Sequence, residues 1–249
     1  MEYYYRDFTE ANYMRLMELA KSKYEFIKVA DYRRDRARKV IINRHDLDSS
    51  LHRAEKLSAI EKEVGVTSAY FVYLHSPFYS VFEKGAIGLI QRIAGNGHEV
   101  GLHFEPWFYG IEQGMRKELE SCLEFEKGVL ETLSGLKVSA FSFHNPDRGG
   151  WASFPDDTVC GLINMYGGYF KDSYGYCSDS DGHWRYRRLE DVLDKAEEER
   201  LQVLTHPEWW TPEVMKPRER IMRCAEGRLG SCMRQYDETM SAMGRTNEK

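Results

Sequence analysis

The sequence has little net charge, no long apolar run and no paired cysteine motif. Its 249 residues hold 35 Lys+Arg against 40 Asp+Glu, which gives a formal net charge of -5. A balance this even provides no electrostatic reason to bind nucleic acid or an anionic membrane surface. No apolar stretch approaches the roughly 18 residues that a membrane-spanning helix needs. We therefore expect neither a nucleic-acid partner nor a transmembrane segment.

The cysteines do not form a disulfide or zinc-binding pattern. There are five of them, an odd number in a long chain, and no two have the CxxC spacing. This usage is typical of free thiols in a reducing compartment. The N-terminal residues also lack a basic segment followed by an apolar stretch, the mark of a secretory signal. Together these features predict a cytoplasmic protein.

No repeat, low-complexity tract or Pro/Gly/Ser linker divides the chain, so we expect a single domain over residues 1–249. Short apolar runs alternate with amphipathic helical stretches, and this alternation predicts an α/β fold with a parallel sheet. The length and the absence of a GxGxxG turn favour a barrel-like arrangement. An N-terminal helix is expected at about 9–22. A C-terminal helical extension is expected at about 211–243, with Thr211 and Pro212 as its cap and first position.

Histidines follow the expected strands with unusual regularity. Five apolar runs that are typical of buried strands end in a histidine, namely His45, His75, His103, His144 and His206. Two carboxylates, Asp46 and Asp48, lie just beyond the first of these runs. In a parallel barrel, all carboxyl ends of the strands open on the face where active sites are assembled. We therefore expect one site to be formed by the side chains of Asp46, Asp48, His75, His103, His144 and His206.

Carboxylate and imidazole ligands together suit Zn, Fe, Mn, Co or Ni. Three protein ligands with an open water position form the catalytic arrangement, which lowers the pKa of the bound water towards ~7. A second carboxylate could deprotonate that water, and a histidine on the opposite side could protonate the leaving group. Asp46 and Asp48 are two residues apart, so an extended strand directs both to the same side.

Four segments, taken in order, resemble the motifs of the polysaccharide deacetylase family, metal-dependent carbohydrate N- or O-deacetylases with a distorted (β/α) barrel. They are Arg44-His45-Asp46-Leu47-Asp48, the segment 97–103 that ends in His103, the segment 141–146 with His144 and Pro146, and the segment 203–207 with His206. The resemblance implies a distorted barrel of about seven parallel strands. It also implies Asp46 as the catalytic base, Asp48 and His103 as metal ligands, and His206 as the proton donor.

Two positions depart from the family pattern. The family's second metal histidine stands where this chain has Trp107, and its arginine that pairs with the base stands where this chain has His144. A ligand set of Asp48, His103 and His144 reconciles both departures. Glu105 or His75 could take the third place instead, and loss of the metal site is a further alternative.

Other residues are expected to support the site. Arg44 and His45 are expected to orient the two aspartates, whereas His98 is expected to be structural. Aromatic and hydrogen-bonding groups near the strand ends suit sugar rings, although the tryptophans could equally pack the barrel rim. The candidates for substrate contact are Trp107, Asn145, Asp172, Glu208 and Trp209.

The resulting hypothesis is a metal-dependent hydrolase that removes an acyl (acetyl) group from an amino sugar, with zinc as the expected metal and Fe, Co, Ni or Mn as alternatives. The expected substrate is a small molecule, a sugar nucleotide or lipid-linked glycan of bacterial surface polysaccharide (O-antigen of lipopolysaccharide, or capsule) biosynthesis. A cyclic amide or ureide hydrolase and a non-catalytic sugar-binding protein are the alternatives. The methionine-rich C-terminal helix is compatible with a homo-oligomer.

Overall fold

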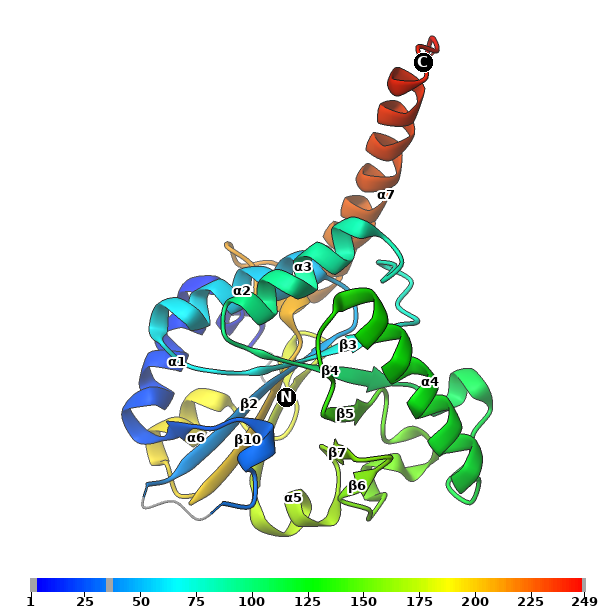
Figure 1. Cartoon of the computed structure of the whole chain (residues 1–249). Helices are drawn as coiled ribbons and strands as arrows, with labels where there is room; N and C mark the ends of the chain where they lie inside the picture. The colour runs from blue at the N-terminus through cyan, green and yellow to red at the C-terminus, as the bar shows by residue number, and fades with distance from the viewer. Residues whose placement is uncertain (1–3, 35–37, 248–249) are drawn as a thin grey trace.

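The computed structural model describes residues 4–34 and 38–247 (Figure 1). Residues 1–3, 35–37 and 248–249 of the expected domain lie outside the described part. The strands are β1 (Glu25–Phe26), β2 (Val40–Leu47), β3 (Ala69–Tyr73), β4 (Glu99–Phe104), β5 (Ala140–Phe143), β6 (Thr158–Val159), β7 (Leu162–Asn164), β8 (Gly175–Ser180), β9 (His183–Trp184) and β10 (Arg200–Thr205). The α-helices are α1 (Glu10–Lys23), α2 (Leu51–Val64), α3 (Lys84–Gly95), α4 (Arg116–Ser134), α5 (Gly168–Ser173), α6 (Leu189–Lys195) and α7 (Pro217–Ala242). Short 3-10 helices are η1 (Tyr5–Asp7), η2 (Val29–Asp31), η3 (Pro106–Tyr109), η4 (Arg148–Ser153) and η5 (Pro207–Trp209).

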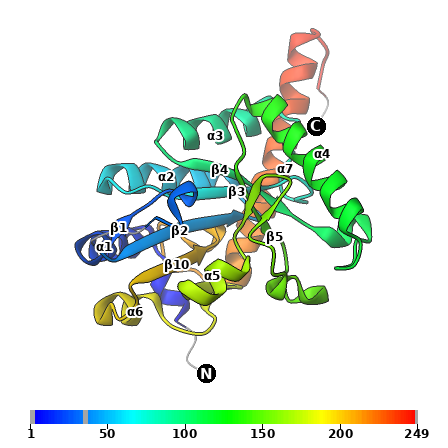
Figure 2. The ribbon, with the colours of Figure 1, turned by 60° about the horizontal axis from the view of Figure 1, so that its bottom comes forward.

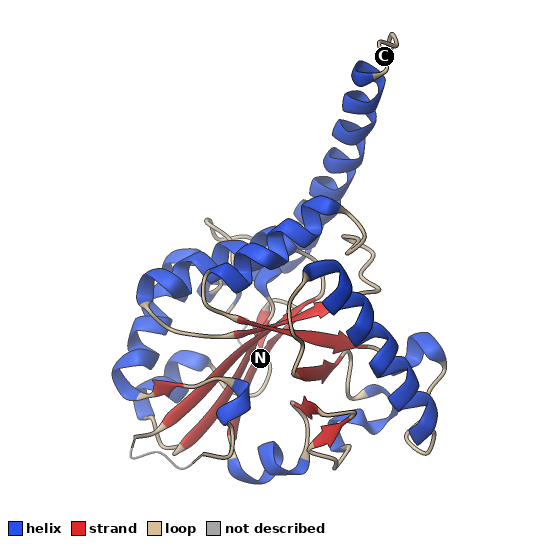
Figure 3. Cartoon of the chain, in the orientation of Figure 1, coloured by secondary structure: helices blue, strands red, loops and turns tan. Residues whose placement is uncertain are grey.

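The strands form one sheet in the order β6-β7-β5-β4-β3-β2-β10-β8-β9, with β1 paired to β2. The central pairs from β7 to β8 are parallel, and only the pairs at the two edges, β6 with β7 and β8 with β9, are antiparallel. The expected α/β class with a parallel sheet is therefore confirmed (Figure 3). The sheet curves like part of a barrel but stays open, because β6 and β9 do not pair with each other.

Helices cover the outside of this sheet. In space α6, α1, α2, α3 and α4 each pack against the next, and Figure 2 shows this layer from a second side. Within the described ranges, no helix has the length and apolar content needed to cross a bilayer.

The helix ends follow local side-chain chemistry. Thr9 caps α1 as its side chain accepts a hydrogen bond from the Asn12 backbone N–H at 3.3 Å. The expected start of the last helix at Thr211 is wrong, because Thr211 forms a bridge with Thr9 instead. The helix begins at Pro217, where the missing N–H of proline costs nothing.

The segment 171–185 is polar and contains glycine, and its sequence indicates no regular element. It contains instead the end of α5 and the strands β8 and β9. Glycine, serine and aspartate dominate β8, so its sequence lacks the apolar signature of a buried strand.

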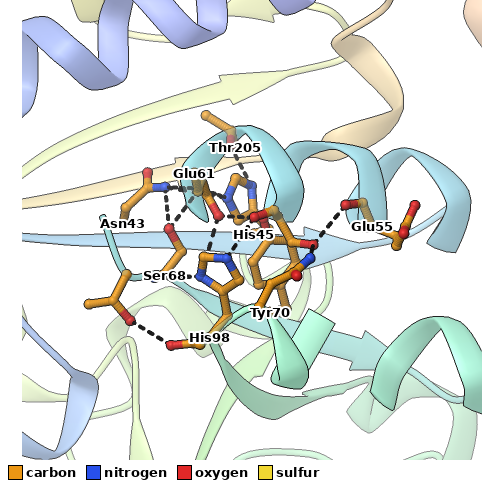
Figure 4. Close-up of polar contacts among 12 residues, drawn as sticks. Asn43, His45, Glu55, Glu61, Ser68, Tyr70, His98 and Thr205 are labelled. Carbon is orange, nitrogen blue, oxygen red and sulfur yellow. Dashed lines mark hydrogen bonds and ion pairs between the residues drawn. The ribbon is translucent and has the colours of Figure 1, made fainter. Parts of the chain in front are cut away.

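All eight residues of β2 are buried, although four of them are polar. Successive side chains on a strand point to opposite faces. Arg44 and Asp46 therefore face one side, and Asn43 and His45 the other. The second pair joins a polar cluster with Glu61 of α2 (Figure 4).

In this cluster Glu61 is fully buried and its carboxylate is surrounded by donors. Its Oε1 accepts from Tyr13 Oη at 2.5 Å and Asn43 Nδ2 at 2.7 Å, and Oε2 accepts from Tyr70 Oη at 2.5 Å. His45 Nε2 lies 2.8 Å from Oε1. Burial raises the pKa of Glu61, but His45 and the hydrogen bonds outweigh it and lower the pKa to about 2. The cluster therefore holds a charged carboxylate inside the fold.

Two more contacts tie neighbouring elements to this cluster. The hydroxyl of Thr205, the last residue of β10, lies 2.8 Å from His45 Nδ1. His98 Nδ1 accepts a hydrogen bond from the Ser68 backbone N–H, and His98 Nε2 lies 2.9 Å from the Ser58 carbonyl oxygen. The cluster thus links α2 to β2 and to the end of β10, just before His206.

Candidate active site

Three elements bring one potential metal ligand each to the carboxyl edge of the sheet. Asp48 follows β2, His103 lies near the end of β4, and His144 follows β5. One donor atom from each residue lies within 4.8 Å of the others. His103 Nε2 is 3.2 Å and His144 Nδ1 is 3.4 Å from Asp48 Oδ1, and the two nitrogens are 3.1 Å apart.

These donor atoms fit a divalent metal. Asp48 Oδ1 is buried and accepts no hydrogen bond in the described structure, so it is an orphaned acceptor pointing at two imidazole nitrogens. Burial raises the pKa of Asp48, but His103 and His144 hold it well below its usual value. A carboxylate and two imidazoles form the donor set that Zn, Fe, Co, Ni and Mn accept.

Ser142 fixes which nitrogen of His103 is free. Its hydroxyl donates to Asp46 Oδ1 at 3.0 Å and lies 2.7 Å from His103 Nδ1. Since that hydroxyl hydrogen is already used, His103 Nδ1–H must be the donor to the serine oxygen. The lone pair of Nε2 then faces Asp48 and His144, as metal binding requires. Ser142 was not among the expected site residues, although it lies on β5 two residues before His144.

His144 is held in place from two sides. The Tyr73 ring stacks on it with centroids 4.4 Å apart, and the Asn145 side-chain amide lies 2.8 Å from its Nε2. Nδ1 faces the cluster. Asn145 has φ +48°, a left-handed conformation that asparagine tolerates better than most residues.

The two alternative third ligands lie elsewhere. Glu105 accepts the hydroxyl hydrogen of Tyr73. His75 lies 2.8 Å from Glu126 of α4 and stacks on Phe108. Neither belongs to the group of converging donor atoms. The expected convergence therefore holds for His103, His144 and His206 but not for His75.

Asp46 lies behind the metal-ligand group with a cation beside it. It is 1% exposed, and Arg44 Nη2 is 3.9 Å from its Oδ2. The Arg44 guanidinium is fully buried, lies over the Tyr166 ring at 4.6 Å and has no hydrogen-bond partner in the described structure. Arg44 thus supplies the positive charge next to Asp46 although no arginine stands at the position of His144.

His45 lies on the opposite face of β2 from these residues. It contacts Glu61 and Thr205 rather than Asp46 or Asp48. Its expected place beside the aspartates is therefore wrong, since a one-residue step along a strand reverses the side chain's direction.

On the other side of the site, His206 is paired with Asp179 of β8. His206 Nδ1 is 2.6 Å from Asp179 Oδ1, and the His206 backbone N–H donates to the same carboxylate at 3.1 Å. Burial lowers the pKa of His206, but Asp179 outweighs this and raises it well above 6.5. The free Nε2 lies 3.9 Å from Asp48 Oδ2. No sequence pattern points to Asp179, because β8 lacks the apolar residues that mark a buried strand.

A cavity of about 560 Å³ opens beside these groups. Gln202 and Leu204 of β10 contribute to its lining, together with the aromatic side chains of Tyr166, Phe170, Tyr174, Tyr176 and Tyr186. Asp46, Asp48, His103, His144 and His206 line the same cavity. The catalytic and ligand candidates therefore share one chamber, whose wall combines aromatic rings with polar and charged side chains.

The candidates for substrate contact divide between the cavity and its surroundings. Asn145 lines the cavity, whereas Asp172 lines a separate depression. Trp107 donates to the Arg148 carbonyl oxygen at 3.2 Å and packs under the guanidinium of the same residue.

Two further candidates lie in the interior. Trp209 is buried in an apolar cluster with residues of α1. Glu208 is also buried, and burial together with the charge of Asp48 raises its pKa to about 8. Neither residue lines the cavity, so their expected contact with substrate is not supported.

Comparison with known proteins found no matching family model and no matching curated protein. Among solved structures, the chain is similar to a family 4 acetyl xylan esterase from Clostridium thermocellum in complex with a cobalt ion, at 13% identity and a TM-score of 0.43, with 76% of this chain and 84% of that chain covered. A family 4 carbohydrate esterase from Bacillus anthracis has 14% identity and a TM-score of 0.44, with 86% of this chain and 85% of that chain covered.

A third solved structure, a family 4 pseudoenzyme from Bacillus anthracis, has 14% identity and a TM-score of 0.46, with 82% of this chain and 65% of that chain covered. All three of these solved structures are described as family 4 proteins, and all three have low identity to this chain. At such identities and TM-scores, a function for this chain has to be argued from its own side chains.

Proposed function

We propose that this chain is a divergent, metal-dependent deacetylase of the polysaccharide deacetylase type, which removes an acyl group from an amino sugar. The observation that carries the proposal is the convergence of Asp48, His103 and His144 next to two further groups suited to proton transfer. Binding alone would not need a buried carboxylate and an ion-paired histidine on either side of a ligand set.

Bound to Asp48, His103 and His144, a divalent metal would supply a Lewis acid and lower the pKa of a water molecule towards ~7. We propose zinc, because its preference for nitrogen and carboxylate ligands matches the donor set; Fe, Co, Ni and Mn accept the same ligands. Asp46 is the proposed base. Arg44 and Ser142 hold its carboxylate, so that it can take the proton from the attacking water.

His206 is the proposed acid. Because Asp179 raises its pKa, His206 is protonated at neutral pH and Nε2 carries the proton towards the chamber. Breaking the C–N bond of the amide requires protonation of the departing amine, and His206 lies on the side of Asp48 where it can supply that proton.

The chamber supports a small sugar substrate. A volume of about 560 Å³ holds one or two sugar rings, and tyrosine rings stack on their C–H faces. Gln202 Oε1 is buried in the chamber without a partner and can accept a hydroxyl hydrogen. We propose a sugar nucleotide or lipid-linked intermediate of bacterial surface polysaccharide (O-antigen or capsule), modified in the cytoplasm. The five unpaired cysteines suit that compartment.

Amine release from a panel of N-acetylated sugar nucleotides tests this function directly. We expect metal-loaded wild-type protein to release amine. Asp46→Asn and His206→Ala should each lower kcat about 10²- to 10⁴-fold while the metal stays bound. Asp172→Asn, outside the chamber, is the matched control and should keep full activity.

A metal-loaded protein that hydrolyses a cyclic ureide but no N-acyl sugar would overturn the substrate proposal and favour the alternative hydrolase. A metal-loaded protein that hydrolyses neither substrate and still binds sugars would overturn the catalytic proposal and favour the sugar-binding protein.

A further inference from the structure

Helix α7 extends away from the body of the protein (Figure 1). It is attached near its start, where Arg220 Nη2 donates to the Tyr5 carbonyl oxygen at 2.8 Å and Arg228 Nη1 lies 2.6 Å from Glu83 Oε1. Arg220 is its only buried residue within the described chain. The part from residue 229 onward is exposed or half-exposed along its whole length.

An apolar stripe runs along this free part. It consists of Leu229, Met233, Tyr236, Met240 and Met243, at successive spacings of four, three, four and three residues. Leu229 is 64% exposed, Tyr236 50% and Met243 58%. A stripe with this alternation is the narrow seam of a two-helix coiled coil, not the broad face that packs on a globular core. The spacing therefore points to another helix as the missing partner.

The free part is poorly suited to stand alone as a helix. It contains Gly230, and glycine lowers the stability of a helix interior relative to alanine. Isolated helices shorter than about 12–15 residues are marginal in water even with favourable residues. Packing along the seam would supply the stabilisation that the local sequence lacks.

The charges of this segment argue against a lipid surface as the partner. Residues 229–243 carry Arg234, Asp237 and Glu238 and no lysine, so the segment has a net charge of -1. Helices that lie on membranes are instead rich in Lys and Arg on their polar face. The same low charge means that two copies of the segment would repel each other only weakly.

We propose that α7 pairs with α7 of a second copy of this chain through the seam Leu229–Met243. A second copy offers the same four-three spacing. Three of the positions next to the seam, Gly230, Cys232 and Thr239, are small enough to let two helices approach closely. Phe82 is 74% exposed and precedes Glu83, the partner of Arg228, so it adds apolar surface where α7 leaves the body.

The size of the seam sets the strength of the pairing. At 1.5 Å per residue, residues 229–243 span about 21 Å. A single seam of this length is a small contact compared with a standard interface, which buries roughly 800 Å² per partner. We therefore expect a reversible dimer with a dissociation constant on the order of micromolar.

Sedimentation equilibrium of the full chain from about 1 to about 100 µM tests the proposal. The mass should rise from 29.2 kDa towards twice that value. The double variant Leu229→Glu/Tyr236→Glu should remain a monomer throughout and lose helical circular dichroism. Gln235→Glu/Ser241→Glu adds the same two charges on the face of α7 away from the seam, and should dimerise like the wild type.

Metal content should be equal in all three proteins, because α7 contributes nothing to the chamber. This readout separates loss of pairing from misfolding. A wild type that remains a monomer at the highest concentration would overturn the proposal, and so would a dimer that persists in the seam variant.

Discussion

Replacing Glu61 with glutamine should strongly destabilise the fold. The buried carboxylate accepts hydrogen bonds from Tyr13, Asn43 and Tyr70 and lies 2.8 Å from His45 Nε2. The drop of its pKa from 4.5 to about 2 corresponds to about 3 kcal/mol at 1.36 kcal/mol per pKa unit. Removing one partner of a buried charged pair costs about 3–5 kcal/mol by direct measurement in other proteins. The pKa shift and the measurements in other proteins thus give the same order of magnitude for the loss in the free energy of unfolding.

We therefore expect Glu61→Gln to lower the free energy of unfolding by about 3 kcal/mol at pH 7, and Tm by about 10 °C for a chain of this size. Urea unfolding followed by circular dichroism measures the first quantity. Glu63→Gln changes an exposed residue of the same helix and should shift stability by less than about 0.5 kcal/mol.

The stabilisation that Glu61 contributes depends on pH in a defined direction. The folded-state pKa of Glu61 is depressed, so its stabilisation is fully present above about pH 4.5 and is lost as the pH falls towards 2. The difference between wild type and Glu61→Gln should be constant from about pH 5 to 8 and shrink below that range. A difference under about 1 kcal/mol at pH 7, or one that grows on acidification, would refute the reasoning.

Two further predictions concern the proton-transfer groups. Asp179→Asn removes the carboxylate that raises the pKa of His206, so activity that needs protonated His206 should be lost at lower pH than in wild type. In a pH–rate profile we expect kcat at pH 8 to fall about 10²-fold and the difference from wild type to shrink at pH 5.5. An unchanged profile would exclude His206 as the acid. Arg44→Met leaves the buried Asp46 without its neighbouring cation, so the free energy of unfolding should fall by about 3 kcal/mol and kcat by roughly tenfold or more. Thermal unfolding and steady-state kinetics measure the two effects, and Arg38→Met, which changes an exposed arginine, is the control.

Much of the site could be predicted because parallel strands share an edge. Histidines and aspartates that follow separate apolar runs must meet there if the runs are parallel strands. Asp48, His103, His144 and His206 follow this rule, and their side chains line one cavity. The rule is independent of whether the sheet closes, so the open edge between β6 and β9 did not affect it.

The side chains that support the site were harder to infer, for a physical reason in each case. The direction of a side chain depends on strand register, and a single residue separates His45 in the Glu61 cluster from Asp46 in the chamber. Asp179 lies on a strand whose composition does not look like one. Trp209 and Glu208 follow a strand end but turn into the interior with η5.

The proposed metal centre depends on His144 as its third ligand, since Trp107 stands where the family resemblance implies a histidine. Elemental mass spectrometry on untagged protein, prepared without chelator, tests it most directly. We expect about one divalent ion per chain in wild type and in Trp107→Ala, and loss of the ion in Asp48→Asn, His103→Ala and His144→Ala. A wild type that holds no metal even after zinc is added, or a His144→Ala variant that keeps its full content, would contradict the proposed metal centre.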